Sequence, residues 1–112
     1  MTLEAQNKIF GTVLRTRVLF TLALVGETFP SELARLIDSK LFPVQRILDS
    51  LEREGVVASR KIGVERRVTL NPRFFAHAEL QTLLSKLGEQ DSRLQQSLAK
   101  RRSRPRRRGK PI

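Results

Sequence analysis

The spacing of the apolar residues changes twice along the chain, and these changes limit the possible folds most narrowly. Between residues 12 and 54 apolar side chains recur every three or four positions, as on one face of a helix. From Val56 to Leu70 β-branched residues flank a short glycine-containing turn, which indicates a β-hairpin ended by Pro72. Helical spacing resumes near Phe74. A chain of 112 residues in this order is expected to form one small domain that is mainly α with a small β-hairpin.

Capping and turn residues divide the helical part into segments. Thr12 and Gly26 bound a helix that is apolar almost all round, as expected for a central helix. Pro30 and Pro43 each open a helix, because the fixed φ of proline suits a first helical turn. Gly55 ends the second of these. The helices expected from these boundaries span residues 3–10, 12–26, 30–37, 43–54 and 74–87.

The cations gather at the C-terminal end. The chain has 22 Lys and Arg against 11 Asp and Glu, a formal net charge of +11. Residues 100–112 hold eight of the cations and no acid, so they carry +8, and residues 1–99 carry 14 minus 11, or +3. Such a stretch buries too little apolar surface to fold, and we expect a disordered basic tail until a polyanion neutralises it. Nucleic acid is the expected partner, ahead of an anionic membrane.

Composition argues against several classes of protein. No window approaches the ~18 unbroken apolar residues of a membrane span, and residues 1–10 lack the pattern of a secretory signal. We therefore expect a cytoplasmic, nucleoid-associated protein with no membrane partner. With no cysteine and one histidine, His77, the chain offers no ligand set for a metal or cofactor. It also lacks a phosphate-binding glycine loop and a nucleophile motif, so we expect no enzymatic activity.

The order helix, helix, tight turn, helix, basic hairpin, helix is that of a winged helix-turn-helix. Several motifs resemble the ArsR/MarR-type bacterial and archaeal winged-helix regulators over about residues 9–87. They are Glu32-Leu33-Ala34, Val44-Gln45-Arg46-Ile47-Leu48, Leu51-Glu52-Arg53-Glu54-Gly55-Val56-Val57, an ArsR-like start at Ile9-Phe10-Gly11-Thr12, and Leu70-Asn71-Pro72-Arg73 at the end of the wing. The resemblance implies that residues 43–54 form the recognition helix, which enters the DNA major groove. Family members begin that helix with Ser or Thr, where this chain has Leu41-Phe42-Pro43.

The candidate DNA contacts fall into three groups. The recognition helix offers the residues that its apolar face leaves outside, which are Pro43, Gln45, Arg46, Asp49, Ser50 and Arg53. Gln45 suits adenine and Arg46 suits guanine, while Asp49 accepts from cytosine or orients Arg46. The wing offers Arg60, Lys61, Arg66 and Arg67 for phosphates. The tail offers Lys100, Arg101, Arg102, Arg104, Arg106, Arg107, Arg108 and Lys110, and its end resembles a degenerate AT-hook suited to an A·T minor groove.

These features predict three parts, a winged-helix domain over residues 1–88, a helical extension or linker over 89–99 and a basic tail over 100–112. The predicted function is sequence-specific binding of double-stranded DNA by a repressor-like regulator. A homodimer is expected through the first helices and the 74–87 helix. Two alternatives stay open: a winged-helix module that recruits a partner enzyme or binds RNA, and an architectural protein that binds DNA without sequence preference.

Overall fold

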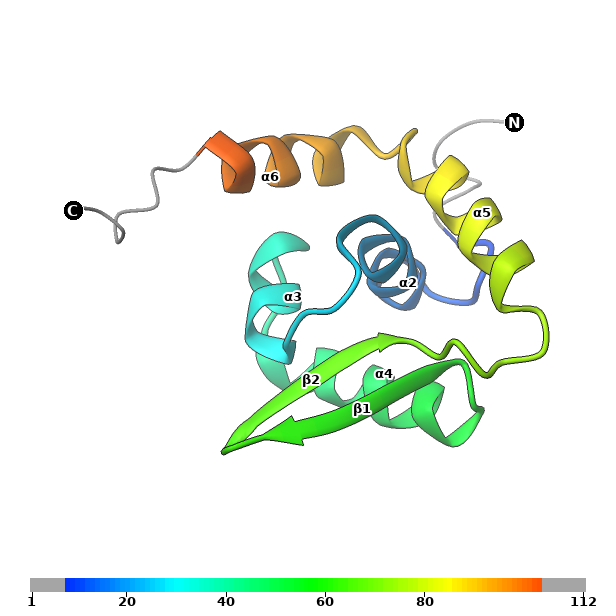
Figure 1. The fold of residues 1–112 in the computed structure, drawn as a ribbon. Coiled ribbons are helices and arrows are strands. Elements are labelled where there is room, and N and C mark those ends of the chain that lie inside the picture. Colours follow the sequence, from blue (N-terminus) through cyan, green and yellow to red (C-terminus); the bar gives the residue numbers. More distant parts are fainter. Residues whose placement is uncertain (1–7, 104–112) are drawn as a thin grey trace.

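The computed structural model describes residues 8–103, with the backbone alone for 102 and 103. Within this range it contains five helices and one hairpin (Figure 1). They are α2 (Val13–Val25), α3 (Pro30–Leu36), α4 (Leu41–Arg53), β1 (Val57–Ile62), β2 (Glu65–Leu70), α5 (His77–Gly88) and α6 (Ser92–Ser103). Most of the helix expected over residues 3–10 lies outside the described range, and residues 8–10 form a turn. None of the helices in the described range is long and apolar enough to cross a bilayer.

Helix α2 is the centre of the fold, as its apolar surface predicts. The backbone N–H of Arg15 donates to the Thr12 hydroxyl at 3.0 Å, which caps the first turn. Gly26 ends the helix with φ of +78°, a conformation that favours glycine. Phe20 and Leu22 are almost fully buried. Figure 1 shows α5 and α6 on one side of α2, and the hairpin with α4 on the other.

Helices α3 and α4 form the helix-turn-helix pair. Val44, Leu48 and Leu51 give α4 its buried face, in agreement with the predicted spacing. The predicted start at Pro43 is wrong by two residues, because α4 begins at Leu41. Proline is tolerated there, since backbone N–H groups of a first helical turn have no partner within the helix.

The predicted hairpin is confirmed and is joined to the segment before α3. Strands β1 and β2 pair antiparallel, with Arg60 opposite Arg67. Beyond the hairpin, the backbone of Thr28 exchanges hydrogen bonds of 3.0 and 2.8 Å with that of Val68. Val68 is fully buried, so the base of the wing is fixed to the core. The Thr28–Val68 hydrogen bonds and the burial of Val68 therefore fix the position of the wing relative to the core.

The C-terminal helices differ most from the expectation. Helix α5 begins at His77 and not near Phe74, because hydrogen-bonded turns occupy residues 71–76. Gly88 is the last residue of α5 and packs closely: a Cβ there would lie 3.0 Å from Leu24 Cδ1. The described chain then continues as α6 to Ser103, so the basic tail does not begin at residue 100 as an extended segment. The expected disorder of residues 104–112 lies outside the described residues.

Helix α6 forms because it finds partners in the core. Leu94 and Leu98 are buried, and Asp91 accepts a hydrogen bond from the Leu94 backbone N–H at 3.1 Å. The Asp91 carboxylate is fully buried and accepts from Arg17 Nε at 2.9 Å. A buried charge without its partner costs about 3–5 kcal/mol, so this pair holds the start of α6 firmly on α2. Residues 92–99 therefore lie in α6, which packs on the core through Leu94 and Leu98.

Candidate nucleic-acid interface

The outer face of α4 is a stripe of exposed side chains. Phe42, Arg46, Asp49 and Arg53 follow one another at helical spacing, opposite the buried face of the helix. All four are exposed, so the elements of the described chain leave this face open. An α-helix with one open face and an apolar back is the element that fits a major groove about 12 Å wide.

The predicted residues of α4 separate into a central and a flanking group. Arg46 and Arg53 lie on the open stripe, and Gln45 is half-buried beside it. Ser50 belongs to one flank, where it lies 3.5 Å from a guanidinium nitrogen of Arg15 on α2. Pro43 is half-buried in the first turn. The structure thus brings Gln45, Arg46 and Arg53 together, and leaves Pro43 and Ser50 at the edges.

Asp49 and Glu52 hold a wing arginine. Arg66 Nη2 lies 3.1 Å from Asp49 Oδ1 and 3.0 Å from Glu52 Oε1. Arg66 Nε lies 3.3 Å from Ser59 Oγ, and that hydroxyl also lies 3.0 Å from Glu52 Oε1. We call these four side chains the wing latch, because they join β1 and β2 to α4. Two carboxylates around one guanidinium leave the latch with a net negative charge.

Two further wing arginines are also paired with acids. Arg60 forms two hydrogen bonds with the Glu27 carboxylate, at 2.9 and 3.1 Å. Hydrogen bonding from Arg60 lowers the pKa of Glu27, because the guanidinium favours the charged carboxylate. Arg67 lies 3.1 Å from Glu65, with its guanidinium 5.7 Å from the Phe29 ring centroid. Of the four predicted wing cations, Lys61 alone makes no ion pair with any of the described residues.

The end of α6 is attached to the start of α3. Arg101 Nε donates to Glu32 Oε2 at 2.8 Å, and the Thr28 hydroxyl also donates to the Glu32 carboxylate. Burial works to raise the pKa of Glu32, but the hydrogen bonds from Thr28 and Arg101 outweigh it, so the pKa is lowered. The chain therefore leaves the described fold close to the helix-turn-helix pair. Of the tail candidates, Lys100, Arg101 and Arg102 lie in α6, while Arg104, Arg106, Arg107, Arg108 and Lys110 lie outside the described residues.

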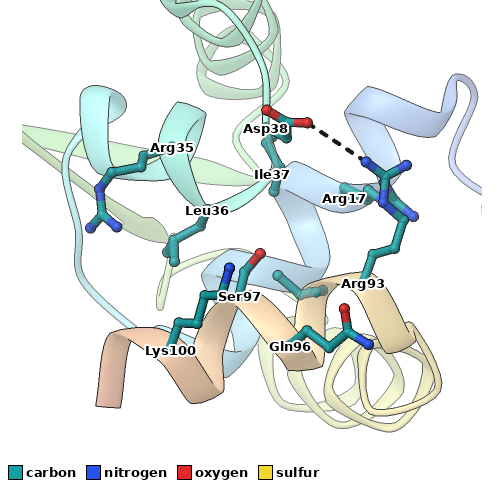
Figure 2. A pocket seen from close by; sticks show the side chains of 10 residues that line it. Arg17, Arg35, Leu36, Ile37, Asp38, Arg93, Gln96, Ser97 and Lys100 are labelled. Atoms are coloured by element: carbon teal, nitrogen blue, oxygen red, sulfur yellow. Dashed lines mark ion pairs between the residues drawn. The ribbon is translucent and has the colours of Figure 1, made fainter. Parts of the chain in front are cut away.

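A cavity of about 360 Å³ lies between the end of α3 and α6 (Figure 2). Arg17, Arg93 and Lys100 give its wall a positive charge, above an apolar floor that includes Leu36 and Leu94. Two of these arginines have acidic partners: Arg17 pairs with Asp91, and Arg93 lies 3.7 Å from the exposed Asp38. The cavity lies apart from the open face of α4, and Lys100 is the one predicted site residue in its wall.

Sequence reasoning missed two kinds of residue at this interface. The sequence pattern identifies Phe42 only as a departure from the expected Ser or Thr, although 65% of this residue is exposed. Helical spacing carried the signal, because Phe42 precedes Arg46 by four positions. The acidic partners Glu27, Glu52 and Glu65 were also missed. Glu27 comes from another part of the chain, and no local pattern joins it to Arg60.

Comparison with known proteins identifies the fold. No protein-family model matches the chain, and no curated protein is significantly similar to it in sequence. Among solved structures, a MarR mutant from E. coli complexed with operator DNA has 24% identity and a TM-score of 0.57, over 88% of this chain and 69% of that one. AdcR from Streptococcus pyogenes has 16% identity and a TM-score of 0.60, over 88% of this chain and 72% of that one.

YusO from Bacillus subtilis is a third similar structure, with 18% identity and a TM-score of 0.57 over 89% of this chain and 79% of that one. At these identities the similarity establishes the fold. This fold agrees with the resemblance of the sequence to the ArsR/MarR-type regulators. The chain has the winged helix-turn-helix fold that these three structures share.

Proposed function

We propose that this protein is a transcriptional regulator that binds double-stranded DNA at specific sites, with α4 in the major groove. The observation that carries the proposal is the open stripe of α4, on which Phe42, Arg46, Asp49 and Arg53 are all exposed. The MarR mutant of similar fold is complexed with operator DNA, which supports the same use of the fold here. A protein with this function would act as a repressor at the nucleoid and would need no catalytic group.

The side chains have separate roles in this proposal. Gln45 and Arg46 read base edges, each good pair contributing about 1–3 kcal/mol of discrimination. Lys61, Arg53 and the tail cations neutralise phosphates. Arg60, Arg66 and Arg67 contact phosphate only where it displaces a carboxylate, because each is already paired. Base reading is thus assigned to α4, and most of the attraction to the cations beyond Ser103.

A homodimer is part of the proposal. One winged helix reads few base pairs, and pairing through the first helices and α5 would place two α4 helices on half-sites about 34 Å apart. Leu83 on α5 is 45% exposed, and Phe75, just before this helix, is 93% exposed. These are the apolar surfaces that a second copy would cover. The preferred site should then be an inverted repeat.

Selection from a random duplex library, followed by fluorescence anisotropy on the enriched site, tests the proposal. The unaltered chain should bind the enriched site more tightly than a scrambled duplex or an RNA of equal length. Arg46→Ala should weaken binding to the enriched site about 5- to 100-fold, and binding to the scrambled duplex much less. Light scattering at micromolar concentration should give the dimer mass.

Other outcomes would favour the other functions. Equal affinity for every duplex, lost with residues 104–112, would support an architectural protein. Preference for RNA, or no duplex binding at all, would contradict the proposal and favour an interaction module. Equal loss on both duplexes for Arg46→Ala would make Arg46 a phosphate contact.

A further inference from the structure

An exposed aromatic ring lies at the N-terminal end of α4, which is the end that would read base edges in the proposed function. Phe42 lies in the first turn of α4, with 65% of the residue exposed. The N-terminal residues of a recognition helix are the ones that reach the bases. Ser or Thr would offer a hydroxyl at this end, whereas Phe42 offers an apolar ring. A side chain of this kind needs a different part of the base to contact.

Phe42 is paired with the residue that the proposed function assigns to guanine. The Arg46 guanidinium carbon lies 5.7 Å from the centroid of the Phe42 ring, within the range of a cation–π contact. The two residues are one turn apart on the open stripe. The contact limits the motion of both side chains, so a flat apolar ring and a fork of N–H donors are presented side by side.

The chemistry of this pair matches two neighbouring bases. Arginine donates two hydrogen bonds to O6 and N7 of guanine, and phenylalanine is among the side chains that contact the 5-methyl group of thymine. Four helical residues rise about 6 Å, and base pairs are stacked about 3.4 Å apart. We infer that Phe42 contacts the methyl group of a thymine about one or two base pairs from the guanine bound by Arg46. The inference rests on the proposed function and specifies its site.

The charge around the ring favours DNA over a second copy of the chain as the occupant of this surface. Lys40 and Arg46 flank Phe42, and both are exposed cations. Two copies meeting at this surface would bring like charges together, which opposes association. A duplex places its phosphates beside the same cations while the ring enters the groove. The exposed ring and the cations around it therefore suit one partner.

Replacement of single thymines by deoxyuridine in the enriched duplex tests the inference, because it removes one methyl group and leaves every base pair in place. Each half-site should contain one sensitive thymine. Replacing that thymine in one half-site should weaken binding by the unaltered chain about fourfold, the effect of one buried methyl group. Phe42→Ala should bind the thymine and deoxyuridine duplexes equally. Val64→Ala, which shortens an exposed apolar side chain in the turn between β1 and β2, should keep the fourfold difference.

The position of the sensitive thymine is a second readout. It should lie about one or two base pairs from the guanine at which Arg46→Ala loses discrimination. If no deoxyuridine effect depended on Phe42, the thymine contact would be disproved while site-specific binding stood. If Phe42→Ala lowered the mass in light scattering, the ring would belong to an interface between copies. Failure to enrich any duplex would contradict the proposed function, and the thymine contact with it.

Discussion

The wing and the segment after Ser103 carry similar numbers of cations, but their surroundings differ. The wing has four, and three of them are held by the carboxylates of Glu27, Asp49, Glu52 and Glu65. Residues 104–112 have five cations and no acid. Charge counted along the sequence assigns both regions to phosphates. The structure shows three of the wing cations already paired, and a guanidinium that has a carboxylate partner gains less from a phosphate than one without such a partner.

Removal of residues 104–112 should have the largest effect. Each duplex phosphate neutralised by a cation adds about 0.9 to the slope of log affinity against log salt, so the five cations contribute up to about 4.5 for each chain, and up to about 9 for the dimer. A chain ending at Ser103 should lose most of this slope and keep its preference for the enriched site. Its core is complete, because α6 and the Arg101–Glu32 pair remain. Anisotropy from about 50 to 200 mM salt measures the change.

A chain with the order of residues 104–112 shuffled is the matched control. It should keep the slope, since counterion release depends on charge and not on order. Loss of A·T preference in the shuffled chain would assign a minor-groove contact to the AT-hook-like end. A slope that falls by less than about 1 on truncation would show that the wing and α4 supply the phosphate contacts after all.

Release of Arg66 from the wing latch should have the second largest effect, because it would make a wing cation resemble one without a carboxylate partner. Asp49→Asn with Glu52→Gln releases Arg66 from both carboxylates, so the slope should rise by about 0.9 for each bound chain and affinity for a scrambled duplex should increase. In an Arg66→Gln background the same two changes should alter the slope much less. This double-mutant cycle separates a released arginine from the plain loss of two negative charges. Equal changes in both backgrounds would mean that Arg66 does not contact phosphate once freed.

Local signals in the sequence predicted the helices and strands. Contacts between residues far apart in the sequence determined which charges of the candidate site are paired. Thr12 and Gly26 bound α2 because capping depends on the backbone next to each residue. The extent of α6 was not predictable in this way, since Leu94 and Leu98 show only a fragment of a repeat until the core receives them.

The same limit applies to the candidate site. The exposure of Arg46 follows from helical spacing, and the sequence was sufficient to select it. Arg66 is also a cation that the sequence assigns to the DNA-binding surface. Its partner Asp49 lies 17 positions away in the sequence and contacts it only because the wing packs on α4. Burial, pairing and net charge at a surface are properties of the fold, so the wing could not be distinguished from the tail before the fold was known.

Glu32 joins α6 to the start of α3, and the pH dependence of this contact gives the smallest expected effect. Its pKa is lowered in the folded protein, so the charged carboxylate stabilises the fold above the unfolded value, near pH 4.5. This stability is lost as pH falls through the lowered folded pKa. Glu32→Gln should therefore reduce the free energy of unfolding by about 1 kcal/mol at pH 7 and by much less near pH 3.

Thermal unfolding of both chains across this range measures the effect of Glu32→Gln, with Glu79→Gln as the control. Glu79 lies in the first turn of α5 and makes no ion pair within the described chain, so its removal should give a small change that varies little with pH. If the difference in the free energy of unfolding between Glu32→Gln and the unaltered chain stayed constant from pH 7 to pH 3, packing and not charge would hold α6 on α3. The attachment of α6 to the helix-turn-helix pair would then depend on Leu94 and Leu98, and Arg101 could leave Glu32 for a phosphate at little cost to the fold.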